Sequence, residues 1–131
     1  MANATVIHVR DLVGNGELAD PTPDVLDTGT SPVTLYTEDV KNAELVVLKL
    51  ENTATSDVMT VDVEAGANPP AFRAGIGKLT VTLAGLATKW VGPFEAARFL
   101  QADRTLKVTS TPASTKTQTL KITCFRLPRN F

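Results

Sequence analysis

The chain has 131 residues, of which 43% are hydrophobic, with a formal net charge of −1 and a single cysteine. This length is typical of one domain with a sizeable core. A single cysteine excludes an intrachain disulfide. The near-neutral charge gives no indication of a nucleic-acid or membrane partner. No apolar run approaches the roughly 20 residues of a membrane helix, and residues 1–10 lack the pattern of a secretory signal.

Charge is divided unevenly along the chain. Residues 1–66 hold 3 basic and 12 acidic side chains, and residues 67–131 hold 10 basic and 2 acidic ones, so the two halves sum to −9 and +8. Two explanations are open. Either strands from the two halves interleave and neutralise each other, or the acidic half of one subunit docks on the basic half of a neighbour, in a salt-sensitive association.

Residues 1–30 are rich in turn signals. Gly14-Asn15-Gly16 and Asp20-Pro21-Thr22-Pro23-Asp24 break any long element, so we expect an extended N-terminal arm or edge segment, with a weak strand over residues 5–9. The segment has five acidic residues against one basic residue, and we expect it to reach a neighbouring subunit or another partner. The candidate partner contacts are Arg10, Asp11, Asp20, Asp24, Asp27, Asn68 and Arg73.

Residues 31–131 show the two-residue alternation of apolar and polar side chains that is typical of strands. Residues 44–51 are apolar on both faces, which indicates a central strand, whereas the other strands have one apolar face, as in antiparallel sheets with a solvated side. A hairpin turn is expected at residues 52–57 and a helical turn at residues 93–98. The remaining strands are predicted at 33–37, 58–64, 78–83, 88–91, 105–109 and 117–126.

Seven to nine short strands separated by turns predict an all-β fold. We expect a single antiparallel β-sandwich or jelly-roll-like domain over residues 31–131, preceded by the arm or edge segment over residues 1–30. Trp90 and Phe94 are predicted to anchor its core, with Gly92-Pro93 turning the chain between them. The open alternative is that Trp90 belongs to a contact patch, because Trp is over-represented among binding hot spots.

The sequence contains no recognisable catalytic or metal-binding constellation. His8 and Cys124 are the only histidine and cysteine, too few for a zinc site, and we expect structural roles for both. Asp20, Asp24 and Asp27 lack the spacing of a calcium loop. Nucleophile-elbow and phosphate-binding glycine motifs are absent. The sequence therefore predicts a non-enzymatic protein without a metal or cofactor.

Three stretches resemble a known class of proteins: Leu45-Val-Val-Leu-Lys-Leu-Glu-Asn-Thr, Val61-Asp-Val-Glu-Ala-Gly-Ala-Asn-Pro-Pro-Ala and, most specifically, Trp90-Val-Gly-Pro-Phe-Glu. Over residues 45–128 the chain resembles small virion proteins of long-tailed bacteriophages, most of all capsid decoration (cement) proteins. The resemblance implies a commonly trimeric β-sandwich or jelly-roll subunit, made in the host cytoplasm, that binds the major capsid protein on the outer surface of the virion.

Two other functions remain open at this point. One is a tail or head–tail structural protein of the same kind of particle. The other is a carbohydrate- or surface-binding β-sandwich module, which would show an exposed aromatic cluster.

Overall fold

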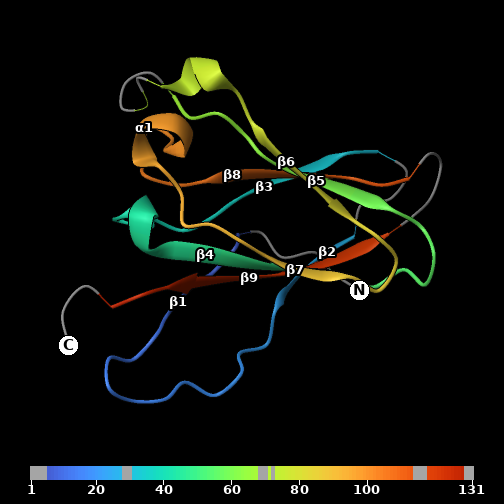
Figure 1. Cartoon of the computed structure of the whole chain (residues 1–131), viewed down its shortest axis with the longest axis horizontal. Coiled ribbons are helices and arrows are strands. Elements are labelled where there is room, and N and C mark those ends of the chain that lie inside the picture. The colour runs from blue at the N-terminus through green and yellow to red at the C-terminus, as the bar shows by residue number, and fades with distance from the viewer. Residues whose placement is uncertain (1–5, 28–30, 68–70, 72, 114–117, 129–131) are drawn as a thin grey trace.

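The computed structural model describes residues 6–27, 31–67, 71, 73–113 and 118–128. Two sheets pack face to face in this part of the chain, so the predicted β-sandwich is confirmed (Figure 1). The first sheet has the order β1-β9-β4-β7, with β2 also paired to β9, and the second has the order β3-β8-β5-β6. The strands are β1 (Val9–Asp11), β2 (Asp24–Asp27), β3 (Val33–Tyr36), β4 (Val46–Asn52), β5 (Met59–Val63), β6 (Leu79–Leu83), β7 (Thr88–Val91), β8 (Lys107–Thr111) and β9 (Thr119–Arg126).

The core lies between the two sheets and follows the alternation in the sequence. Strand β4 is central, as predicted, because it pairs with β9 on one side and with β7 on the other. Its alternate residues point inward, where they meet inward residues of β5, β8 and β9. Fully buried members of this core are Val46, Leu48, Leu50, Met59, Val61, Val63, Val108, Leu120, Ile122 and Cys124.

The strands predicted within residues 31–131 are all present, with ends shifted by two residues at most. The helical turn α1 (Ala96–Phe99) begins three residues later than predicted, because Glu95 is still extended. Two short 3-10 turns, η1 (Ala43–Leu45) and η2 (Ala74–Ile76), were not predicted. None of the described helices is long and apolar enough to cross a bilayer.

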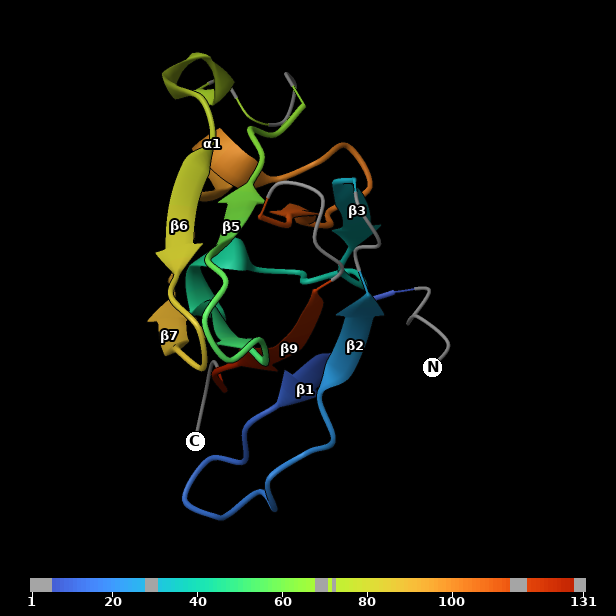
Figure 2. The ribbon, with the colours of Figure 1, turned by 90° about the vertical axis from the view of Figure 1, so that its right-hand side faces the viewer.

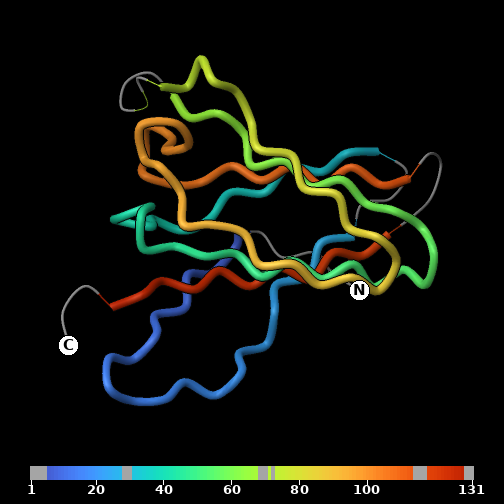
Figure 3. Tube along the Cα trace, viewed as in Figure 1, coloured from blue at the N-terminus to red at the C-terminus, as the bar shows by residue number. Residues whose placement is uncertain are grey.

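The expected hairpin at residues 52–57 was wrong, because β4 and β5 lie in different sheets. The side chain of Asn52 is buried at this corner and its Nδ2 donates to the carbonyl oxygens of Asp57, Leu83 and Ala84 at 2.9, 3.1 and 3.2 Å. These bonds tie the end of β4 to the end of β6 in the opposite sheet. Most connections likewise cross between the layers, as the chain trace shows (Figure 3).

The N-terminal segment is an edge of the sandwich, which was one of the two expectations, and not a free arm. Strand β1 pairs in parallel with the last residues of β9, and β2 pairs antiparallel with the first residues of the same edge. Ile7 and Leu26 are buried in the core, which fixes the segment in place. The connection over residues 12–23 projects away from the sheets (Figures 1 and 2).

Strand β2 was missed because its two apolar residues stand between aspartates that read as turn signals. Asp24 accepts hydrogen bonds from the backbone N–H of His8 at 2.8 Å, and its Oδ1 lies 2.8 Å from His8 Nδ1. Asp27 accepts a hydrogen bond from the hydroxyl of Thr119. Both aspartates therefore bond to side chains or backbone groups that are distant in sequence.

The structure predicts that β2 contributes to the stability of the whole domain. Leu26→Ala should lower the free energy of unfolding by about 2–5 kcal/mol, because it empties a buried site. Val25→Ala is the matched control, since Val25 is only partly buried and points away from the core on the same strand. Urea unfolding of both variants measures the difference, and equal costs would contradict the assignment of β2 to the core.

Candidate binding surface

Trp90 lies on the outer face of the first sheet, so its predicted place in the core was wrong. In the β4–β7 ladder Trp90 is opposite Lys49 and Val91 is opposite Leu48. Successive side chains of a strand point to opposite faces, so the burial of Leu48 and Val91 directs Trp90 to solvent, where 59% of its surface is exposed. The alternative that the sequence left open, a contact patch containing Trp90, is the one compatible with this position.

Phe94 is in the core as predicted, 1% exposed. Val91 and Phe94 both face the core although they are three residues apart, so the alternation of the strand is interrupted between them. Gly92 lies at this point with φ +121° and leaves no room for a side chain, because a Cβ there would lie 2.7 Å from the carbonyl oxygen of Val46. The Phe94 ring meets that of Phe99 edge to face, with centroids 5.6 Å apart.

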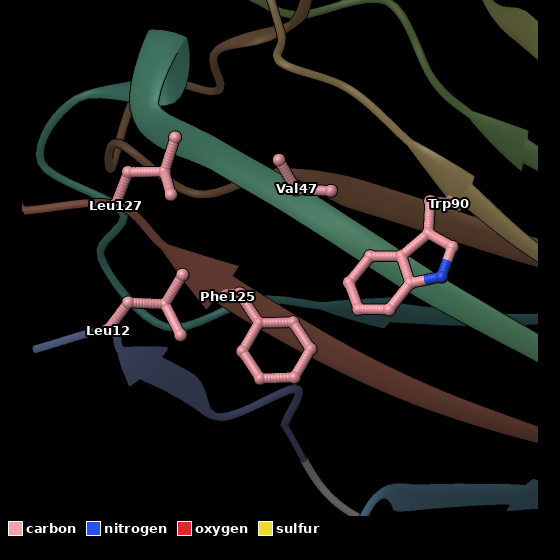
Figure 4. A pocket seen from close by; sticks show the side chains of 5 residues that line it. All are labelled: Leu12, Val47, Trp90, Phe125 and Leu127. Atoms are coloured by element: carbon pink, nitrogen blue, oxygen red, sulfur yellow. The ribbon is translucent and has the colours of Figure 1, made fainter. Parts of the chain in front are cut away.

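An open apolar hollow of about 310 Å³ surrounds Trp90 on this face (Figure 4). The Trp90 ring stacks on that of Phe125, with centroids 5.5 Å apart and an angle of 22° between the planes. The two rings come from β7 and β9, and β4 between them supplies Val47. The lining residues are Leu12, Val47, Trp90, Phe125 and Leu127, all of them apolar.

A charged hollow of about 210 Å³ lies further along the same strands. Lys49 connects the two hollows, because it lines the charged one while its Nζ lies 5.7 Å from the centroid of the Trp90 ring. The outer face of the first sheet is therefore apolar at one end and charged at the other. The residues lining the charged hollow are Asp20, Pro21, Pro23, Lys49, Glu51, Lys121 and Thr123.

Four of the seven candidate contact residues from the sequence have partners within the subunit, although Asp11 and Arg73 remain 63% and 59% exposed. Asp11 accepts two hydrogen bonds from the guanidinium of Arg126, and Asp24 is buried against His8. Asp27 is bonded to Thr119, and Arg73 forms an ion pair with Glu95. These four side chains bridge parts of the sandwich.

The remaining candidates differ in their surroundings. Arg10 donates from Nη2 to the carbonyl oxygen of Thr22 at 3.4 Å, across the base of the projecting loop. Asp20 is exposed on that loop and lines the charged hollow. Asn68 lies outside the described residues. The candidate set did not include Trp90, although the hot-spot preference of tryptophan was a signal in the sequence that pointed to it.

The uneven charge along the sequence is partly mixed by the fold. Three ion pairs each join one residue of the acidic half to one of the basic half, as the interleaving explanation expects. The pairs are Lys78–Asp62, Arg104–Asp39 and Arg126–Asp11. The hydrogen bonds that Arg126 donates to Asp11 also raise the pKa of Arg126 above its ordinary value.

Within the described ranges, no three histidine, cysteine, aspartate or glutamate side chains gather as metal ligands would. His8 binds Asp24 at the start of β1, and Cys124 is buried in β9. Burial raises the pKa of the Cys124 thiol to about 12. Both residues occupy structural positions.

No protein-family model, curated protein or solved structure matches this chain.

Truncation should separate the two aromatic residues of this segment. Phe94→Ala should lower the free energy of unfolding by about 3–5 kcal/mol, as large core truncations do. Trp90→Ala should lower it by only about 1 kcal/mol, the scale of one aromatic contact at the surface. Urea unfolding followed by circular dichroism measures both, and a larger loss for Trp90→Ala than for Phe94→Ala would contradict the placement of Trp90.

Cys124 should report on unfolding through its thiol chemistry. Because its pKa is about 12 and its sulfur is buried, the folded chain should react with a disulfide reagent at pH 8 only on the timescale of opening. Denaturant should restore the ordinary rate of a free thiol. Rapid labelling of the folded chain under native conditions would show instead that β9 is accessible.

Proposed function

We propose that the chain is a non-enzymatic structural protein of a bacteriophage particle, a decoration subunit that binds the outer surface of the capsid and stabilises the shell. The observation that carries the proposal is the apolar hollow around the exposed Trp90. Contiguous exposed apolar surface is typical of interaction sites, and Trp is over-represented among the residues that dominate binding. A surface of this kind favours a role in assembly.

The identity of the partner comes from the resemblance over residues 45–128, whose most specific segment carries Trp90. That segment supplies both an exposed residue, Trp90, and a core residue, Phe94. The resemblance adds the jelly-roll-like arrangement, the trimeric subunit and the major capsid protein as partner. A shell offers the same site many times, so modest contacts from linked subunits raise the overall affinity sharply.

Binding to reconstituted shells tests the proposal. The probe is empty shells assembled from a major capsid protein, which is sought first among the genes that neighbour that of this chain. We expect the purified chain to co-sediment with these shells, to saturate at a fixed ratio of chain to capsid protein, and to raise the temperature at which the shells fall apart.

The control in this experiment is the chain alone, which should stay in the supernatant. Saturable binding to purified tails, without binding to shells, would replace the capsid role with the tail or head–tail alternative. Absence of a capsid gene in the neighbourhood, together with no binding to either structure, would reject a role in the virion.

A carbohydrate-binding module is the second candidate, and the exposed Trp90 is the observation that favours it. Sugars stack on exposed aromatic rings, and the charged hollow beside Trp90 offers polar groups to hydroxyls. Trp90 is the only tryptophan, so its fluorescence reports on its own surroundings. A saturable change in emission with oligosaccharides from the bacterial envelope would support this candidate over the capsid role.

A further inference from the structure

The loop over residues 12–23 has apolar side chains that its own subunit leaves uncovered. Val13 and Leu18, both within this loop, are 53% and 40% exposed. The loop as a whole projects from the sheets (Figure 2). The loop is tied down at its base, where the Leu12 N–H donates to the carbonyl oxygen of Arg126 at 2.9 Å. Exposed apolar residues at a projecting tip favour contact with another surface.

The hollow around Trp90 is an apolar surface that its own subunit leaves open. Trp90 and Leu127 are 59% and 40% exposed there, although Leu12 from the base of the loop already lines one side. The chain therefore carries an apolar projection and an apolar hollow, neither of which fills the other within one subunit.

The charges beside the two features have opposite signs. Glu17 precedes Leu18 on the loop, and Lys49 stands beside Trp90 with its Nζ 5.7 Å from the ring centroid. In the described part of the chain neither residue forms an ion pair. Opposite charges around apolar contacts steer association and fix its orientation.

We propose that the loop tip of a second copy of this chain, residues 13–20, seats in the apolar hollow, with Leu18 against Trp90 and Glu17 toward Lys49. The contact joins two different patches, so two copies can exchange loops about a two-fold axis, or a head-to-tail series can close into a ring when the rotation between copies allows. The proposed contact deepens the proposed function. A trimeric state rests on that function, whereas the contact itself is argued from the loop and the hollow.

Analytical ultracentrifugation of the chain alone tests the contact. The wild-type chain should form an oligomer that weakens between about 0.01 M and about 1 M salt, as charges on the surface are screened. Leu18→Ser and Trp90→Ser should each weaken association at least tenfold. Ile76→Ser is the matched control, because Ile76 is 53% exposed on η2, outside the first sheet. This variant should associate like the wild type. Circular dichroism and thermal unfolding verify that each variant is folded.

Mixing the two variants gives the sharper result. Leu18→Ser keeps an intact hollow and Trp90→Ser keeps an intact loop, so an equimolar mixture should form a 1:1 dimer that neither variant forms alone. A wild-type chain that stays monomeric would overturn the inference, as would a mixture that stays monomeric or an Ile76→Ser control that loses association.

The outcome separates this inference from the proposed function. Self-association without shell binding would support the loop contact and reject the capsid role. A chain that is monomeric, binds shells, and no longer binds them after Trp90→Ser would overturn the loop contact. The hollow would then be the surface that contacts the shell.

Discussion

The backbone of β9 holds three other strands in register, and the rest of the sandwich depends on that pairing. One edge of β9 takes the whole of β4, while the other edge is divided between β2 and β1. Its inward residues are fully buried in the core, and outward Phe125 supports the ring of Trp90. The same strand therefore fixes the N-terminal edge on one side and the floor of the apolar hollow on the other.

The alternation of side chains was enough to predict the strands of residues 31–131, because period two is a local property of the chain. The partner of each strand was not predictable in this way. The corner at Asn52 has the spacing of a hairpin, yet its side chain bonds to carbonyl groups of β6 and of the turn after it, more than 30 positions along the chain. Strand β2 was hidden because Asp24 has its partner in His8, 16 positions earlier in the chain, and a local pattern does not show that contact.

The candidate surface was predictable only as an alternative. Tryptophan suits both cores and interfaces, and the sequence cannot say which face of a four-residue edge strand points inward. That choice is made by Leu48 and Val91, which pair across the ladder on the buried side. The charge division was likewise ambiguous, and the ion pairs of Asp11, Asp39 and Asp62 neutralise part of it within one subunit.

The parallel pairing of β1 with β9 has a mechanical consequence. Val9 lies beside Cys124 and Asp11 beside Arg126. The chain therefore enters β1 at one end of this ladder and leaves β9 at the opposite end. Tension applied through these two ends pulls the strands past each other. The hydrogen bonds between them then bear the load together, in shear, and do not open one after another as in a peeled hairpin. A subunit built this way resists stretching along the direction of its first and last strands.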